Sequence, residues 1–264
     1  MNCLFYSTAS EYDRNLGLKS EECMKRLEEV IPGSKNTQIK KLTASFLVRF
    51  IGLLLLLLGL LFIPAGRLDW WEAWLFVLVY AIFILVYLLR GLRKDPDQII
   101  ERSHTSKNVK SWDKTILSIY TILLVVMLVV ASLDAGRFRW APVSLVMEII
   151  GWLGFCLAGS LIWWTASVNT FLSRQVRIQE ERGHHAVTTG PYHYVRHPMY
   201  DGVILFIICI PLILGSAWAL LPAGWIAVLF VVRTALEDKT LREELTGYRE
   251  YADKVRYRLL PGIW

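Results

Sequence analysis

The sequence predicts an all-α, polytopic integral membrane protein with about five to six membrane-spanning segments. Hydrophobic residues make up 55% of its 264 residues, while 20% of the residues are charged, and the mean hydropathy is +0.41. A soluble domain of this size would not carry so many apolar residues, whereas apolar spans joined by polar loops account for both percentages. Several apolar runs also approach the roughly 20 residues that a helix needs to cross the hydrocarbon core of a bilayer.

Four long apolar segments and two shorter ones follow a polar head at residues 1–41. The long segments comprise residues 42–64, 70–89, 115–133 and 143–166, and the shorter ones residues 203–214 and 217–232. Two prolines and two glycines interrupt the short pair, namely Pro211, Gly215, Pro222 and Gly224. This pattern predicts a tight helical hairpin or two slightly short spans. The chain thus divides into the head, a four-span region at 42–166 and a C-terminal region at 167–264 that contains the hairpin.

The head predicts a helix that begins near Ser20 and ends at Pro32 and Gly33. Ser20 is a favourable N-cap residue, and Met24 and Leu27 follow at helical spacing. The mixed charge of this segment leaves open whether it is an interfacial helix or a mobile tail. Because a polar stretch of this length precedes the first apolar run, we expect no signal peptide.

The distribution of basic residues predicts the orientation in the membrane. The loop between the second and third long segments carries Arg90, Arg93, Lys94, Arg102, Lys107, Lys110 and Lys114. The loops after the first and third segments carry only Arg67 and the pair Arg137 and Arg139. The side rich in Lys and Arg is expected to be cytoplasmic. The head, the stretch at 165–200 and the C-terminus should therefore face the cytoplasm, at the inner membrane if the cell is bacterial.

Composition and spacing argue against nucleic acid, disulfides and metal. The net charge is +6, but the basic residues lie beside the spans and so serve topology. The four cysteines are scattered and show no paired spacing. His193 and His197 are four residues apart, yet Pro191 and Pro198 bracket them, no Glu lies between them, and only Asp201 is near as a further ligand. We therefore expect no metal site.

Two charged residues lie near the end of the last apolar run. Arg233 and Glu237 are four residues apart, so a helix would place them on one face. As a surface ion pair they would stabilise the helix by a few tenths of a kcal/mol. Alternatively, Arg233 could hold an anionic acceptor while Glu237 binds a polar or cationic ligand. Their spacing alone leaves both interpretations open.

Three separated motifs of the C-terminal region occur in a characteristic order. GPYHYVRHPMYDG at 190–202 precedes the hairpin, and R-x-x-x-E-D-x-x-L, which starts at Arg233, and YREYADKVRYRLLP follow it. Over about 169–261 the chain resembles the isoprenylcysteine carboxyl methyltransferase family, which is related to membrane phospholipid N-methyltransferases. The four preceding spans are similar to that family only in general character, and the head has no counterpart. Two departures are Asp238, where a second Glu is common, and Leu245, where Gly is usual.

The resemblance implies a methyltransferase that binds S-adenosylmethionine in a cytoplasmic pocket. The cofactor-binding residues that it implies are Gln179, His184, Val187, Gly190, Tyr192, His197, Pro198, Met199, Tyr200 and Glu237. Arg177 is the alternative to Gln179 as a cofactor-binding residue. Arg233 and Glu237 are the catalytic residues that the resemblance implies, and Arg233 would also bind the methyl acceptor.

The residue types in these positions suit that chemistry. The rings of Tyr192 and Tyr200 can face a cation or a stacked base, and His197 can donate hydrogen bonds to a carboxylate. The planar guanidinium of Arg233 can steer a carboxylate acceptor without quenching its nucleophilicity. The apolar hairpin indicates a lipidic or hydrophobic acceptor that enters the site from the bilayer.

Three functions other than carboxylate O-methylation bear on this sequence. Two of them stay open: a phospholipid-type N-methyltransferase, and a non-catalytic lipid-binding or transport protein of the same fold. The third, a nicotinamide-dependent membrane reductase, is disfavoured because the sequence contains no GxGxxG motif.

Overall fold

The structure is a computed structural model, which describes residues 32–94 and 109–264. The helix predicted around Ser20 lies outside the described residues. The described chain forms two units: the helical segment up to Leu55 belongs to the first, and residues 56–264 form the second, which holds the candidate site.

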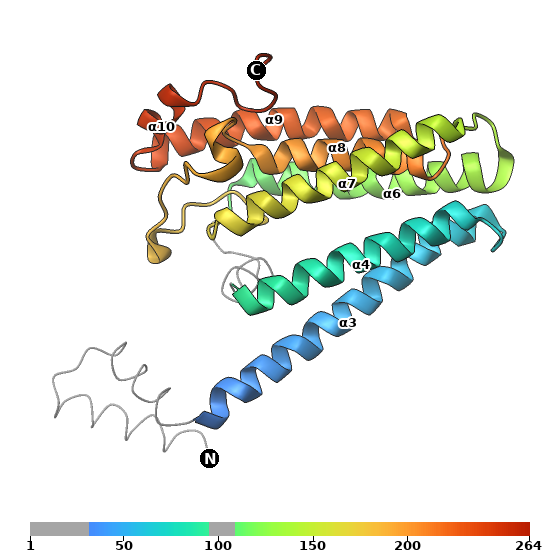
Figure 1. The fold of residues 1–264 in the computed structure, drawn as a ribbon, viewed down its shortest axis with the longest axis horizontal. Coiled ribbons are helices and arrows are strands. Elements are labelled where there is room, and N and C mark those ends of the chain that lie inside the picture. The colour runs from blue at the N-terminus through green and yellow to red at the C-terminus, as the bar shows by residue number, and fades with distance from the viewer. Residues whose placement is uncertain (1–31, 95–108) are drawn as a thin grey trace. The chain divides into compact units, whose positions relative to one another are not determined.

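All long regular elements of the described residues are helices, which confirms the predicted all-α class (Figure 1). They are α3 Pro32–Ala65, α4 Trp71–Lys94, α6 Ser111–Ala131, α7 Leu145–Val168, α8 Pro198–Ile213, α9 Leu220–Glu244 and α10 Tyr248–Lys254. A π-helical turn, η1, continues α6 over Ser132–Phe138. Two short 3-10 turns, η2 Glu180–Arg182 and η3 Gly190–His193, lie in the connection between α7 and α8.

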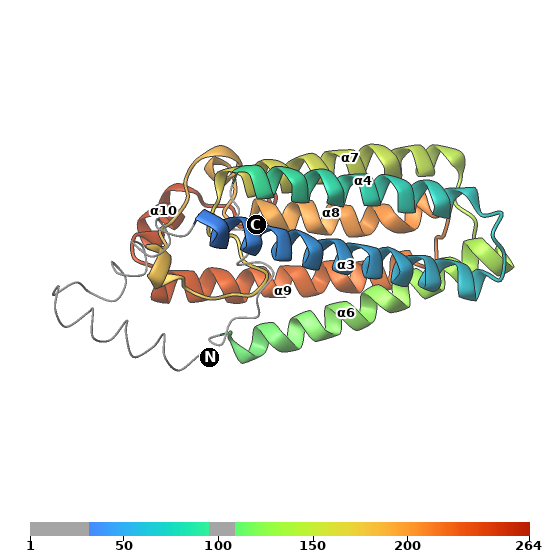
Figure 2. The same cartoon turned by 90° about the horizontal axis from the view of Figure 1, so that it is seen from below.

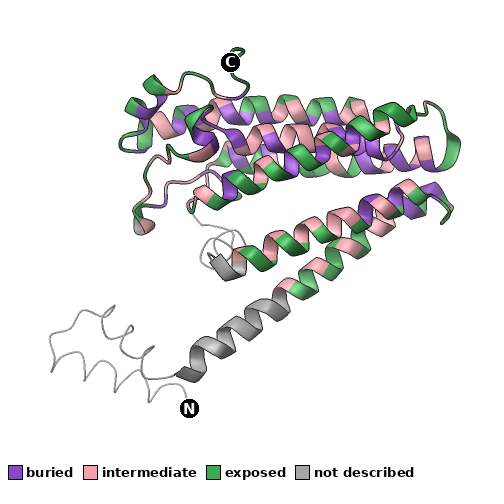
Figure 3. Cartoon of the chain, in the orientation of Figure 1, coloured by how far each residue is buried: buried purple, intermediate pink, exposed green. Residues whose placement is uncertain are grey.

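Five helices are long and apolar enough to cross a membrane. Their apolar stretches are Phe46–Ala65, Trp71–Gly91, Ser111–Phe138, Leu145–Val168 and Leu220–Glu244. Between 17% and 33% of the most apolar window of each stretch is buried inside the protein, so most of these residues are at least partly accessible to lipid. In Figure 3 buried and exposed residues alternate along these helices, which is typical of helices with one face against neighbours.

The predicted hairpin is the pair α8 and α9. The 16 residues of α8 measure about 24 Å, which is shorter than the roughly 30 Å of a hydrocarbon core. Gly215, at φ 78°, lies in the turn between the two helices. Pro198 and Pro222 lie in the first turns of α8 and α9, where the missing N–H of proline costs nothing. Both helices extend beyond the apolar runs, and α9 therefore carries Arg233 and Glu237 on regular helix.

Close packing places α8 between α7 and α9, while α6 packs along α9 (Figures 1 and 2). Small residues permit the approach of α7 and α8. A Cβ atom added at Gly202 would lie 2.7 Å from Ile162 Cγ1, and one at Gly151 would lie 2.8 Å from Leu212 Cβ. The start of α8, which carries the RHPMY motif, is thereby held against the end of α7.

A buried carboxylate organises the end of the second unit where α6 stops. Asp134 is fully buried and accepts hydrogen bonds from the Ala141 amide at 2.8 Å, the Ser216 hydroxyl at 2.6 Å and the Trp218 amide at 3.3 Å. An isolated antiparallel bridge pairs Pro142 with Ser216. These contacts join the segment after η1 to the α8–α9 turn.

Candidate active site

A partly open cavity lies where the α7–α8 connection meets the ends of α9 and α10. It contains about 820 Å³ of empty space, counting its open mouth. The predicted residues that line it are His184, Val187, Tyr192, His197, Met199, Tyr200, Arg233 and Glu237. The fold therefore brings residues from both sides of the hairpin to one cavity.

Three predicted residues do not line this cavity. Gln179 is fully buried; its amide group donates to the Phe171 carbonyl at 2.5 Å and accepts from Arg182 Nη1 at 2.7 Å. Gly190 turns the backbone at φ 62°, and Pro198 is the first residue of α8. Arg177, the alternative to Gln179, does line the cavity. Contact of any of these residues with a cofactor stays a prediction.

The arginine of the RHPMY motif anchors the C-terminal tail. Arg196 is 4% exposed, and its Nη1 donates to the carbonyl oxygens of Ala252, Val255 and Arg256 at 3.2, 2.9 and 3.2 Å. These carbonyls lie at and just beyond the end of α10, where a helix lacks internal partners. The motif's backbone is held as well, because the Arg196 amide donates to the Tyr257 carbonyl at 3.0 Å.

Asp238 is the centre of a buried ionic cluster. Its carboxylate is 1% exposed and lies 2.8 Å from Arg196 Nε and 3.0 Å from Arg258 Nε. Arg242 Nε lies 3.2 Å from the same carboxylate, which also accepts a hydrogen bond from the Tyr248 hydroxyl at 3.0 Å. The residue at which this chain departs from the common family pattern thus joins α8, α9 and the C-terminal tail.

His197 lies between this cluster and the cavity. Its Nε2 is 3.3 Å from the Tyr248 hydroxyl and 3.5 Å from Asp238 Oδ1. Burial first, and then the Asp238 carboxylate, hold the pKa of Tyr248 well above its usual value, so the hydroxyl stays protonated and donates a hydrogen bond to Asp238. It can then only accept from His197, which requires the proton on Nε2. The imidazole stacks on the ring of Tyr200, with centroids 5.8 Å apart and planes at 3°.

Tyr200, Glu237 and Arg233 form the adjoining part of the cavity wall. The Tyr200 hydroxyl donates a hydrogen bond to the Glu237 carboxylate. The guanidinium carbon of Arg233 lies 5.2 Å from the centroid of the Tyr200 ring, within the range of a cation–π contact.

The guanidinium of Arg233 is less free than the sequence suggested. Its Nε donates to Asp113 Oδ1 at 2.8 Å, and its Nη2 donates to the Arg174 carbonyl at 2.9 Å. Nη1 has no hydrogen-bond partner among residues 32–94 and 109–264. Of the three guanidinium nitrogens, only Nη1 is left to contact a carboxylate acceptor, because Asp113, 120 residues earlier in the chain, and the Arg174 carbonyl engage the other two.

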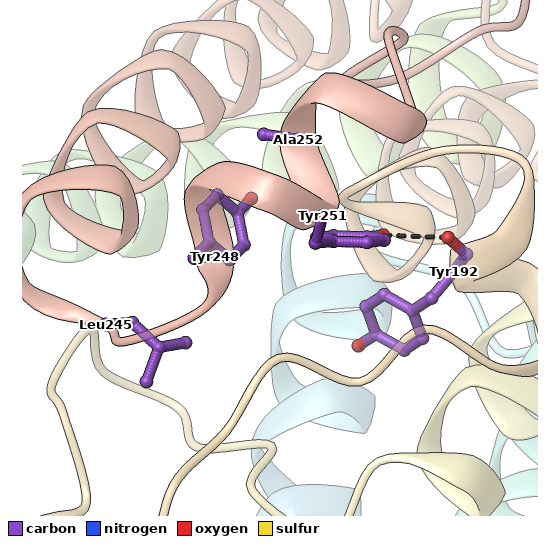
Figure 4. Close-up of a cluster of buried hydrophobic side chains, with 5 residues drawn as sticks. All are labelled: Tyr192, Leu245, Tyr248, Tyr251 and Ala252. Atoms are coloured by element: carbon purple, nitrogen blue, oxygen red, sulfur yellow. Dashed lines mark hydrogen bonds between the residues drawn. The ribbon is translucent and has the colours of Figure 1, made fainter.

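Sequence reasoning missed the aromatic wall formed by α10 (Figure 4). Tyr248, Tyr251, Leu245 and Ala252 form a buried cluster with Tyr192. The Tyr251 hydroxyl donates to the Tyr192 carbonyl at 2.7 Å, and burial raises the pKa of Tyr251. The i, i+3, i+4 spacing of the three α10 residues is the pattern of a buried helix face and could have indicated it.

The histidines of the motif do not gather into a metal site. Within the part of the chain that the structure describes, no group of three or more His, Cys, Asp or Glu residues could hold a metal ion. His193 is exposed, whereas His197 is buried beside Asp238.

Part of the chain is similar to a known protein family. No curated protein matches the chain. Residues 152–243, however, match the isoprenylcysteine carboxyl methyltransferase (ICMT) family. The matched stretch begins inside α7, contains all of α8 and ends in the last turn of α9, so it includes the RHPMY motif, Arg233 and Glu237. This match confirms, over residues 152–243, the resemblance to the isoprenylcysteine carboxyl methyltransferase family seen in the sequence.

Proposed function

We propose that this protein is an integral membrane methyltransferase that takes its methyl group from S-adenosylmethionine and transfers it to a lipidic or hydrophobic acceptor, most favourably a carboxylate. The observation that carries the proposal is the meeting of Tyr200, Glu237 and Arg233 at one cavity. The family match and the five apolar helices support a membrane methyltransferase.

The lining of the cavity fits the chemical groups of this cofactor. When bound, S-adenosylmethionine supplies an activated methyl group on a positively charged sulfur, beside an amino-acid group and an adenine base. The rings of Tyr192 and Tyr200 suit a cation or a base, and the Glu237 carboxylate suits an ammonium group or hydroxyls.

His197 has a more restricted role than that of a free histidine. Its Nε2 faces the Tyr248 hydroxyl and Asp238, so Nδ1 is the ring nitrogen left for a ligand. A neutral ring with the proton on Nε2 would accept at Nδ1, whereas donation to a carboxylate requires a proton on both nitrogens.

A carboxylate acceptor needs no base at neutral pH, because it is already ionised. The work left for the protein is then to orient the acceptor and to exclude water. Nη1 of Arg233 can contact one acceptor oxygen and leave the other free to attack. In this reaction the acceptor oxygen forms a bond to the methyl carbon, and the electron pair of the broken C–S bond stays on sulfur.

A phospholipid-type amine is the alternative acceptor. It would need to lose a proton, and Glu237, one helical turn from Arg233 on the same face, could take it. The neutralisation of Arg233 by Asp113 favours this alternative, because it lowers the attraction of the site for an anion.

The proposal is tested with detergent-purified protein in two steps. Isothermal titration with S-adenosylmethionine should show binding, and titration with a nicotinamide nucleotide should not. Incubation with methyl-labelled cofactor and a membrane lipid extract, followed by mass spectrometry, should reveal a labelled ester if the acceptor is a carboxylate and a labelled amine in the alternative. Cofactor binding without any labelled product would instead indicate a non-catalytic protein, and absence of binding would refute the proposal.

A further inference from the structure

We infer that Asp113 is a positioning residue for the acceptor half of the site, where it holds the guanidinium of Arg233 in the cavity wall. The inference rests on the proposed function for the role of Arg233 itself. Asp113 lies in the first turn of α6, outside the stretch 152–243 that matches the family. No feature of the C-terminal motifs points to it.

Each oxygen of the Asp113 carboxylate holds a different part of the cavity wall. Oδ1 accepts from Arg233 Nε at 2.8 Å, and Oδ2 accepts from the Val176 amide at 2.9 Å. Arg233 and Val176 both line the cavity. The carbonyl of Arg174, two residues before Val176, accepts from Arg233 Nη2 at 2.9 Å. A single buried carboxylate thus joins α6, α9 and the α7–α8 connection at the cavity.

The side chains of Asp113 and Arg233 are both buried, so each needs the other as its ionic partner. Asp113 is 0% exposed and Arg233 is 5% exposed. A buried charge without its partner is costly, whereas a buried pair with its remaining hydrogen bonds made is tolerated. With Nε and Nη2 engaged, the plane of the guanidinium is fixed and Nη1 is the nitrogen left to meet a ligand. The orientation of Nη1 therefore depends on Asp113.

The chain offers a matched control at the other end of the same helical stretch. Asp134 is also 0% exposed and also joins separate segments, through Ser216 Oγ at 2.6 Å and the Ala141 amide at 2.8 Å. It lies in η1, beyond α6, and it does not line the cavity. Substitution of either aspartate should therefore lower the stability of the protein. Only substitution of Asp113 should also lower kcat/KM for the acceptor.

The first experiment compares Asp113→Asn with Asp134→Asn in purified protein. Asn keeps the volume of Asp and one acceptor oxygen, but it lacks the charge and turns an NH2 group towards partners that are themselves donors. For Asp113→Asn we expect S-adenosylmethionine affinity to stay nearly unchanged, while kcat/KM for the acceptor falls at least about tenfold, as for a lost hydrogen bond to a charged group. Asp134→Asn should lower the melting temperature and leave kcat/KM of the folded protein unchanged.

Two results of this experiment would overturn the inference. One is a wild-type kcat/KM for the acceptor in Asp113→Asn. The other is a fall in kcat/KM that Asp134→Asn reproduces equally in folded protein, since a merely structural role would explain it.

A second experiment keeps the inference testable if the wild-type protein transfers no methyl group, a result that would count against the proposed function alone. Melting temperatures are measured for Asp113→Asn, Arg233→Gln and the double variant. Since each single change leaves one buried charge alone, the double variant should melt no lower than the less stable single variant. Strictly additive losses would show that Asp113 does not hold Arg233 and would overturn the inference.

Discussion

The hydroxyl of Tyr200 donates a hydrogen bond to the carboxylate of Glu237, and this contact joins the start of α8 to the second half of α9. Both residues line the cavity. The two arms of the hairpin therefore present one connected polar surface, in which the position of the Glu237 carboxylate depends on a tyrosine from the RHPMY motif.

Glu237→Gln should weaken S-adenosylmethionine binding about ten- to hundred-fold, because a charged hydrogen-bond acceptor is lost while the shape is kept. Isothermal titration measures the effect. Glu244→Gln is the control, because Glu244 lies at the end of the same helix in an exposed pair with Lys110. Equal cofactor affinity for Glu237→Gln and the wild type would remove Glu237 from the cofactor site.

His197→Ala should weaken cofactor binding by a similar factor, since it removes an imidazole that lines the cavity and one partner of Tyr248. His193→Ala serves as the matched control: it lies in the same motif, but its side chain is exposed and does not line the cavity. If both alanine variants bound the cofactor equally well, the assignment of His197 would be wrong.

Arg233→Lys should leave cofactor affinity nearly unchanged and cut turnover at least about tenfold. The ammonium of Lys can reach either Asp113 or the cavity, but it cannot reproduce the three separate directions of the guanidinium. Cofactor titration and turnover are measured on the same preparation. A loss of cofactor affinity as large as that of Glu237→Gln would contradict the acceptor role of Arg233 and, with it, the preference for a carboxylate acceptor.

Asp238→Asn should lower the stability of the protein by about 3–5 kcal/mol, because it leaves the buried guanidinium of Arg196 without its counter-ion. Titration of the detergent-solubilised protein with denaturant measures the change in its free energy of unfolding. Glu243→Gln, which removes an exposed pair with Lys239 at 3.9 Å, should change stability by at most about 1 kcal/mol. Similar stability of the two variants would show that the cluster around Asp238 is not a stabilising centre.

Cysteine labelling tests the predicted orientation. In a background without the native cysteines, Cys at Thr188, an exposed residue of the α7–α8 connection, should resist an impermeant reagent added outside intact cells. Cys at Ser144, an exposed residue at the start of α7, should react, because a single span separates the two positions. The reverse pattern would place the candidate site on the outer side of the membrane.

Much of the fold follows from the sequence because a bilayer imposes simple demands on it. A span must be long and apolar, so the runs at 42–64, 70–89, 115–133 and 143–166 predicted α3, α4, α6 and α7 to within a few residues at most ends. The interrupted apolar runs at 203–214 and 217–232 predict the hairpin, and its helices α8 and α9 extend beyond these runs. Backbone hydrogen bonds continue a helix through polar residues, and α9 therefore runs on to Glu244.

The candidate site, too, could be predicted from the sequence only in part. Residues close in sequence could be grouped from the sequence alone: the RHPMY segment forms one turn and the start of one helix, and the i, i+4 spacing of Arg233 and Glu237 puts both on one helix face. The partners of these residues could not be found in this way. Asp113 is 120 residues from Arg233, and the interaction exists only because α6 packs along α9.

The sequence by itself therefore determined the membrane class, the hairpin and the resemblance of the C-terminal region to a methyltransferase family, since each of these depends on composition or on local order. Only the tertiary structure decided which nitrogen of Arg233 is left for a ligand, and that Asp238 joins α8, α9 and the tail. The physical reason is that a buried charge must find its partner wherever packing places it. In this protein, packing brings together side chains that are far apart along the chain.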